Sequence, residues 1–227
     1  MNINCVDITK SYSDIQGSNQ NDVLKKVNLR IDEGEIIALT GPSGSGKTTL
    51  LNIISGLDNP SSGDVFFDKT AIHKLSLNQR TKFRNNNLGV VFQFFNLLDD
   101  FNVFENIAMP LFIKNENNSV IEQRVKNILN EIDLLNKISS DVTSLSGGES
   151  QRVAIARAMI GLPKLILADE PTGNLDKENT EKIISFLINT CKKNNISLLM
   201  VTHDRELLKK FEKVYSIESG DLKIFTC

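Results

Sequence analysis

The sequence has few cysteines, no long apolar run and no excess of one charge. The three cysteines, Cys5, Cys191 and Cys227, are odd in number and show no paired spacing, which argues against a disulfide framework or a zinc site and fits a reducing cytosol. No run of about 18 apolar residues occurs, so another chain would have to supply any membrane-spanning helices. The net charge of −2 gives no reason to expect nucleic acid as the main partner. Residues 1–10 lack a basic start and an apolar core, so we expect no signal peptide.

The order of the predicted elements indicates an α/β fold. The 227 residues suit one domain with an elaboration, or two small lobes. Near-alternating polarity predicts strands at 3–8 and 27–31, with a polar loop at 11–22 between them. Strands and helices then alternate, which implies a mainly parallel sheet covered by helices. The further predicted strands are 35–40, 64–67, 88–92, 165–168 and 197–201, and the predicted helices are 46–55, 103–109, 120–132, 147–159, 177–192 and 204–210.

The helices in the middle of the sequence interrupt this alternation. We therefore expect a single domain over 1–227, with a core lobe of about 1–92 and 159–227 and a helical lobe of about 93–158. The apolar residues of 120–132 recur at helical spacing, which indicates a helix that faces a core.

A glycine-rich segment joins the strand 35–40 to the helix 46–55. It fits the phosphate-loop pattern G-x-x-x-x-G-K-[ST], and the strand, lysine and helix that the pattern requires are all in place. The glycines let successive N–H groups face one anion, Lys47 adds a positive charge for the β- and γ-phosphates, and the Thr48 hydroxyl is placed to coordinate Mg²⁺. The motif alone indicates a nucleoside triphosphate site, which kinases, GTPases and motors share. The nucleotide-binding residues assigned here are Gly41, Pro42, Ser43, Gly44, Ser45, Gly46, Lys47, Thr48 and Thr49.

Two carboxylates end the apolar strand 165–168. The carboxyl ends of parallel strands face the ligand crevice, so Asp169 would hold Mg²⁺ through water and Glu170 would face the attacking water as general base. The alternative is an acidic helix-capping turn, because Pro171 and Thr172 follow; beside a phosphate loop the catalytic interpretation is favoured.

A second glycine-rich motif, Leu145-Ser146-Gly147-Gly148-Glu149, precedes the helix 147–159. Ser146 and Glu149 match a capping box, and the double glycine bares N–H groups at a helix start, where an anion can bind.

With this motif the sequence resembles the ABC ATPase family, whose signature LSGGQ is LSGGE here. The resemblance covers essentially the whole chain. It implies a P-loop NTPase core with an N-terminal antiparallel β subdomain and an inserted α-helical subdomain. It also implies that two subunits pack head to tail on ATP binding, with Ser146, Gly147 and Gly148 of one subunit covering the γ-phosphate of the other. The further site residues that it implies are Tyr12 stacking on adenine, Gln93 of the glutamine loop at the metal, Asn174, Leu175 and Asp176 of the D-loop, and the switch residue His203, which acts with Glu170 and Lys47 in catalysis.

Within the family, residues 88–111 resemble the ATP-binding subunits of lipoprotein-releasing systems. Macrolide-type exporters and cell-division ATPases are related branches and remain the alternatives. A DNA-repair ATPase is excluded, because there is no room for a long coiled coil between Gln93 and Leu145. The resemblance implies ATP and Mg²⁺ as cofactors, a homodimer, integral membrane permease subunits as partners, and a peripheral position on the cytoplasmic face of the inner membrane without direct insertion.

The segment 92–104, called the aromatic segment below, is rich in large apolar side chains broken by polar ones. A small lobe would find all of them hard to bury, so we expect an exposed patch that docks a permease helix, with Phe92 and Phe104 in the core. Its large apolar residues are Phe92, Phe94, Phe95, Leu97, Leu98, Phe101 and Phe104.

Overall fold

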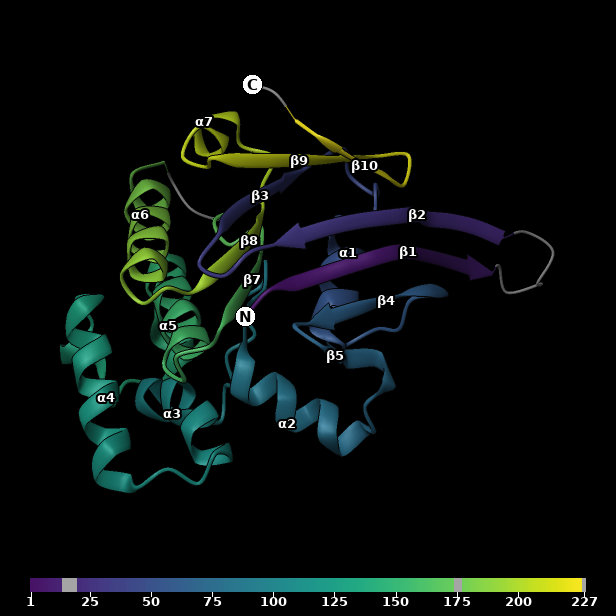
Figure 1. The fold of residues 1–227 in the computed structure, drawn as a ribbon. Coiled ribbons are helices and arrows are strands. Elements are labelled where there is room, and N and C mark those ends of the chain that lie inside the picture. Colours follow the sequence, from purple (N-terminus) through teal and green to yellow (C-terminus); the bar gives the residue numbers. More distant parts are fainter. Residues whose placement is uncertain (14–19, 174–176, 226–227) are drawn as a thin grey trace. The chain divides into compact units, whose positions relative to one another are not determined.

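The computed structural model describes residues 1–13, 20–173 and 177–225, and these form two compact units (Figure 1). The first unit comprises residues 1–84 and 197–227, and the second comprises residues 85–196. The chain therefore begins the first unit, builds the second, and returns to complete the first.

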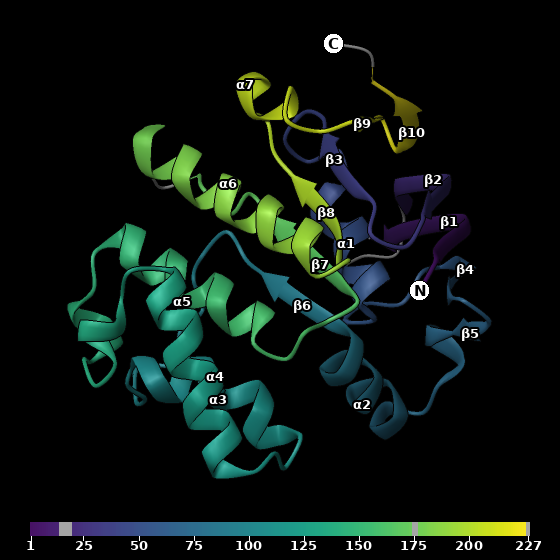
Figure 2. The same ribbon diagram turned by 60° about the vertical axis from the view of Figure 1, so that its left-hand side comes forward.

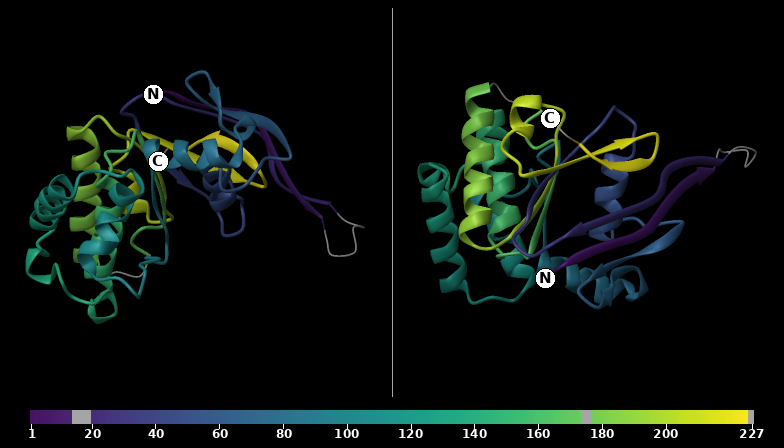
Figure 3. Two further views of the ribbon diagram at one scale, coloured as in Figure 1. Left: turned by 90° about the horizontal axis from the view of Figure 1, so that it is seen from below. Right: turned by 45° about the horizontal axis from the view of Figure 1, so that its top comes forward.

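An antiparallel sheet in the order β2-β1-β4-β5 opens the first unit. Both views in Figure 3 show β1 (Ile3–Ser13) beside β2 (Gln20–Ile31) as a long hairpin; β4 (Ser62–Phe67) and β5 (Thr70–Ala71) complete the sheet. The predicted loop over 11–22 is wrong at both ends, because β1 continues to Ser13 and β2 begins at Gln20. Polar cross-strand pairs form this part of the hairpin: Ser11 lies opposite Asp22, and its Oγ donates to Asp22 Oδ1 at 2.6 Å.

The first unit also contains a parallel group of strands. β3 (Ile36–Thr40) lies between β8 (Ser197–Val201) and β9 (Lys213–Glu218) and runs parallel to both, while β10 (Asp221–Ile224) pairs antiparallel with β9. Every residue of β8 is buried, so its continuous apolar run is what a strand covered on both faces requires. The helical elements of this unit are α1 (Lys47–Ser55), η1 (Ile72–Lys74), most of α2 (Leu77–Asn87) and α7 (Arg205–Leu208).

The second unit combines two parallel strands with helices. β6 (Leu88–Val91) pairs with β7 (Leu165–Asp169), and the register sets Val91 opposite Ala168. Gly89 has a steric role, because a Cβ there would lie 2.3 Å from the Ala158 carbonyl oxygen, so only glycine lets β6 approach the end of α5 so closely. The helices are α3 (Val103–Ile113), α4 (Asn118–Glu131), α5 (Gly147–Met159) and α6 (Lys177–Lys193), with the 3-10 turns η2 (Leu135–Lys137) and η3 (Val142–Ser144).

The helices α3, α4 and α5 share one apolar core (Figure 2). In α4, Ile121, Val125 and Leu129 recur every four residues and are all buried, so the predicted core-facing stripe is confirmed. Capping boxes begin α3 at Asn102 and α5 at Ser146, where each side chain accepts a bond from a backbone N–H three residues on. The predicted capping box at Ser146 and Glu149 is therefore confirmed.

Candidate nucleotide site

The phosphate loop is built by its glycines. It connects the end of β3 to Lys47, the first residue of α1, and Gly41, Gly44 and Gly46 all have positive φ, at 143°, 75° and 105°. A Cβ on Gly46 would lie 2.8 Å from the Val23 carbonyl oxygen, so both conformation and space demand glycine there. The N-terminus of α1 has no side-chain cap, unlike those of α3 and α5. Its first N–H groups have no intrahelical partner and point where an anion would bind.

The polar side chains of the loop fit a bound triphosphate. Lys47 is 8% exposed, and its ammonium donates to the carbonyl oxygens of Gly41 at 3.0 Å and Pro42 at 2.8 Å, which hold the positive charge over the loop. Ser45 Oγ is buried and has no hydrogen-bond partner in the described ranges of the chain. A buried hydroxyl without a partner is costly, and a phosphate oxygen would supply the missing bond.

His203 lies at the same strand edge as the phosphate loop. β3 and β8 are parallel, Leu39 is opposite Val201, and the Thr202 N–H donates to the Leu39 carbonyl oxygen at 3.1 Å. The loop and His203 are the next residues after these paired strand ends, so the fold brings them to one edge, as predicted from the sequence.

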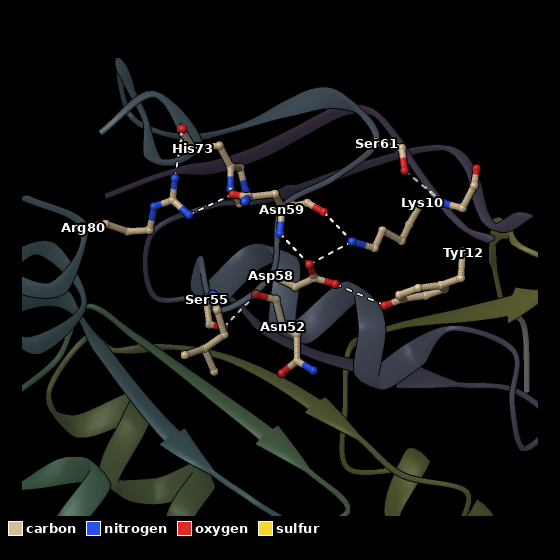
Figure 4. A network of polar contacts seen from close by, with 11 residues as sticks. Lys10, Tyr12, Asn52, Ser55, Asp58, Asn59, Ser61, His73 and Arg80 are labelled. Carbon is tan, nitrogen blue, oxygen red and sulfur yellow. Dashed lines mark hydrogen bonds and ion pairs between the residues drawn. The ribbon is translucent and has the colours of Figure 1, made fainter. Parts of the chain in front are cut away.

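Tyr12 lies on β1 in the same unit and is 46% exposed. Its hydroxyl donates to Asp58 Oδ2 at 3.1 Å, and the Lys10 ammonium donates to Asp58 Oδ1 at 2.8 Å (Figure 4). Lys10 and Asp58 were not among the site residues predicted from the sequence. No local pattern marks Asp58, because its partner Tyr12 is 46 positions away in the sequence.

The side chains of Gln93 and Glu170 both approach Gly173 in the second unit. Parallel pairing of β6 and β7 brings the residues after Val91 and Ala168 to one edge. Gln93 Nε2 and Glu170 Oε2 both lie within 4 Å of the point that a Cβ on Gly173 would occupy, at 3.9 and 3.8 Å. Glu170 also has a φ of 43°, which a residue with a side chain rarely adopts. Such strain persists where the surroundings impose it, and it often marks functional residues.

The signature motif caps α5 and leaves its glycines accessible. The Glu149 N–H donates to Ser146 Oγ at 3.3 Å, and Glu149 Oε2 accepts from the Ser146 N–H at 2.8 Å. This backbone hydrogen bond holds the pKa of Glu149 below its ordinary value. Gly147 is exposed, and a Cβ on Gly148 would lie 3.7 Å from the Asn179 side chain, an ordinary contact. Nothing in the described part of this unit therefore requires Gly148 to be a glycine.

The predicted site residues divide between the two units. The first unit carries Tyr12, His203 and the phosphate loop 41–49; the second carries Gln93, Ser146, Gly147, Gly148, Asp169 and Glu170. Asn174, Leu175 and Asp176 of the predicted D-loop lie outside the described residues.

The aromatic segment exposes part of its apolar surface. Phe94, Leu98 and Phe101 are 70%, 41% and 38% exposed, which confirms the predicted patch at these three positions. Phe104 is half-buried against the helical core, as is Leu97, and Phe92 and Phe95 are half-buried too. The expectation that Phe92 and Phe104 are core residues is therefore only partly met, because each keeps an edge in solvent.

Two polar residues that sequence analysis overlooked hold this segment in shape. The fully buried Asn106 donates to the carbonyl oxygens of Leu98 and Phe101 at 3.0 Å and accepts from the Leu98 N–H at 2.8 Å. Arg157 of α5 donates to the carbonyl oxygens of Asn96 at 2.7 Å and Phe95 at 3.0 Å. The available signal for the first of them was an asparagine directly before the apolar run 107–111.

Comparison with known proteins identifies the class. The family described as ABC transporter matches residues 24–173, and the chain belongs to this family. The chain is accordingly an ATP-binding, ATP-hydrolysing subunit of ABC type, with the fold predicted from the sequence.

Two curated relatives resemble the chain along nearly its whole length. The lipoprotein-releasing system ATP-binding protein LolD of Buchnera aphidicola subsp. Acyrthosiphon pisum is 42% identical over 220 residues, covering 97% of this chain and 96% of that protein. LolD of Pseudoalteromonas translucida is 45% identical over 222 residues, covering 98% and 95%.

Solved structures agree with this assignment. An ATP-binding cassette solved as a post-hydrolysis dimer bound to ADP and phosphate has a TM-score of 0.90 and 35% identity, covering 99% of both chains. A second dimeric structure of the same cassette, described as a bacterial ABC transporter cassette, has a TM-score of 0.90 and 37% identity, covering 97% of this chain and 96% of that one.

Proposed function

We propose that this chain hydrolyses ATP to drive a membrane permease that releases lipoproteins from the inner membrane. The observation that carries the proposal is the identity of 42 to 45% to two lipoprotein-releasing ATP-binding proteins over nearly the full chain. Agreement along the whole length favours lipoprotein release over macrolide-type export or force transmission in cell division. No helix in the described residues is long and apolar enough to cross a membrane. In the proposed complex the permease chains supply the spanning segments, and this subunit is held at the cytoplasmic face.

The proposed chemistry uses residues of both units. The phosphate loop, through residues 41–49, binds the triphosphate, with Lys47 supplying the positive charge. Thr48, Gln93 and Asp169 would hold Mg²⁺, which neutralises charge on the β- and γ-phosphates when it is bound. Glu170 accepts the proton of the attacking water, and His203 contacts the γ-phosphate. The approach of both Gln93 and Glu170 to Gly173 supports this arrangement, because both groups are needed around the same phosphate.

The proposed active form is a head-to-tail homodimer, with Asp176 at the interface. Ser146, Gly147 and Gly148 of one subunit would cover the γ-phosphate held by the phosphate loop of the other. The glycine at 148, which its own unit does not require, supports this proposal, because a partner's phosphate would need the space and the bare N–H groups. One similar cassette, solved twice as a dimer, supports it further.

Lipoprotein release itself can be tested in reconstituted membranes. The subunit would be purified together with its permease, placed in proteoliposomes that carry a lipoprotein, and supplied with ATP. We expect ATP-dependent release of the lipoprotein to a soluble acceptor. Failure to release lipoprotein, with ATP hydrolysis intact, would contradict this cargo and leave the ATPase assignment standing.

We further propose that the aromatic segment docks a short cytosolic helix of the permease. A cavity of about 330 Å³ lies beside it, lined by residues that include Leu88, Phe92, Pro110 and Arg157. The exposed Phe94 and Leu98 supply apolar surface in the same segment. An apolar site with polar surroundings is what an amphipathic helix binds. Gln93 begins the segment, so a change at the γ-phosphate could reach the permease through it.

Phe94→Ala and Leu98→Ala are expected to weaken permease binding about 5- to 50-fold, the loss typical of an apolar residue at an interface. Phe95 is not suitable for this test, because it is half-buried and its carbonyl oxygen receives the Arg157 bond. Pull-down of the purified permease and hydrolysis in nanodiscs measure the effect.

The matched control for the docking test is Phe112→Ala, which removes a phenylalanine that is 40% exposed on α3. The control is expected to bind the permease like the wild type. Equal binding by all four proteins would place the docking surface elsewhere.

A further inference from the structure

The side chain of Tyr12 is held at two points, its hydroxyl and one face of its ring, although the residue is nearly half exposed. Its hydroxyl donates to Asp58 Oδ2 at 3.1 Å. The Lys10 ammonium lies 4.9 Å from the ring centroid and donates to Asp58 Oδ1 at 2.8 Å and to the Asn59 carbonyl oxygen at 2.7 Å. Figure 4 shows the Lys10 and Tyr12 side chains converging on Asp58 from one strand. An exposed tyrosine is ordinarily free to change rotamer, so this arrangement fixes a side chain that packing leaves loose.

The anchor is tied to the helix that carries the phosphate loop. Asp58 follows the end of α1, and the N–H groups of Leu57 and Asp58 donate to the Asn52 carbonyl oxygen at 2.9 and 3.1 Å. Burial raises the pKa of Asp58, but the hydrogen bonds from Lys10, Asn59 and Tyr12 outweigh it, so the pKa lies below its ordinary value and the anchor is charged. The phosphate loop and the ring of Tyr12 are thus positioned from the two ends of one rigid helix.

The position of Lys10 makes the two faces of the ring unequal. A cation at 4.9 Å from the centroid occupies one face and is attracted to it. The ring is 46% exposed, so a planar ligand can stack on the surface that remains open. Holding a ring in its binding orientation before the ligand arrives lowers the entropic cost of binding.

We propose that Asp58, supported by Lys10, is a positioning residue for the base of the nucleotide. It holds Tyr12 in one orientation, with one face open for the base. This inference rests on the proposed stacking of adenine on Tyr12. Affinity for the base, as distinct from affinity for the triphosphate, then depends on Asp58 and Lys10, which do not touch the nucleotide.

The test compares a ligand with a base to one without it. Dissociation constants for ATP and for inorganic triphosphate, each with Mg²⁺, would be measured for Asp58→Ala and for Tyr12→Phe. Tyr12→Phe keeps the ring and the ion pair and removes only the anchored hydroxyl. Each variant is expected to bind ATP about 3- to 10-fold more weakly, with triphosphate binding unchanged. The double variant should lose little more than either single one, because both changes remove the same bond.

Tyrosine emission reports the ring directly. The chain has no tryptophan and only two tyrosines, so Tyr215→Phe leaves Tyr12 as the single tyrosine. In that background ATP should quench the emission and inorganic triphosphate should not. Asp58→Ala should lower the emission anisotropy of the nucleotide-free protein, because the released ring moves faster. Unchanged anisotropy together with unchanged ATP affinity would overturn the positioning role.

Two further variants distinguish the role of Asp58 from the proposed stacking of adenine on Tyr12. Asp64→Ala removes a carboxylate of the same unit that pairs with Lys74 at 3.1 Å, and it should behave like the wild type in both assays. Tyr12→Ala should weaken ATP binding about 10-fold or more relative to triphosphate, as expected for a lost stacking partner. If Tyr12→Ala has this effect and neither Asp58→Ala nor Tyr12→Phe does, adenine stacking stands and the anchor is refuted. If Tyr12→Ala affects both ligands equally, stacking itself is refuted and the anchor with it.

Discussion

Glu170→Gln should slow steady-state ATP hydrolysis by about 10²- to 10⁴-fold while ATP still binds, which is the loss expected when a general base is removed. Glutamine has the size and shape of glutamate, so the packing near Gln93 and Gly173 is kept. It tolerates the positive φ at position 170 no better and no worse, so the backbone strain is unchanged. What disappears is the group that accepts the proton of the attacking water. Phosphate release and nucleotide affinity, measured separately, check the prediction.

The same variant should accumulate an ATP-bound dimer, because the nucleotide that bridges two subunits is no longer consumed. Lys47→Ala should behave differently and weaken ATP binding itself, since it removes the charge held over the phosphate loop. Glu122→Gln is the matched control: it makes the same chemical change in the second unit at an exposed position paired with Lys126. It should hydrolyse ATP at the wild-type rate. Near-normal turnover by Glu170→Gln would remove Glu170 from the mechanism.

Elements that bury an apolar face could be predicted from the sequence. Helix 147–159 was placed with both ends correct, because its start is marked by the capping pair Ser146 and Glu149 and its interior is apolar. Strand 197–201 was equally clear, since every residue in it is buried. The phosphate loop followed from its glycines, whose positive φ values and close contacts admit few other residues.

Elements without such a face were missed, and so was β9, although Val214, Ser216 and Ile217 of this strand are buried. Helix α2 has no buried residue, so it shows no apolar period and was left unassigned. The outer part of the β1–β2 hairpin is polar and was interpreted as a loop. The roles of Asp58 and Asn106 depend on contacts that the folded chain creates. Asn106 bonds to Leu98 and Phe101 of the aromatic segment, and Asp58, in the loop after α1, bonds to Tyr12 of β1. Such hydrogen-bonded pairs cannot be predicted from composition or residue spacing.

The signature helix offers a test in which stability and function should move in opposite directions. Gly148→Asp places a carboxylate at the second position of α5, where the helix dipole favours negative charge, so the fold should be unchanged or slightly stabilised. Space allows it, because the added Cβ would make only an ordinary contact, at 3.7 Å from Asn179. Ser119→Asp is the matched control, since it adds a carboxylate at the second position of α4, where no nucleotide is proposed to bind. Thermal unfolding should show Gly148→Asp to be at least as stable as the wild type. Ser119→Asp loses the bond that Ser119 Oγ donates to Asn117 Oδ1 at 2.8 Å, so the control needs only to remain folded.

Dimerisation should separate the two variants. In the proposed dimer, the new carboxylate at 148 faces the γ-phosphate bound to the other subunit. Two like charges at about 4 Å repel by about 4 kcal/mol at an effective dielectric constant of 20, which corresponds to roughly a thousandfold in affinity. With the Glu170→Gln change as background, light scattering in ATP should show a dimer for Ser119→Asp and a monomer for Gly148→Asp, while the phosphate loop of each monomer still binds ATP. A Gly148→Asp protein that dimerises as well as the control cannot have its signature helix at the partner's γ-phosphate, and the head-to-tail arrangement would then have to be abandoned.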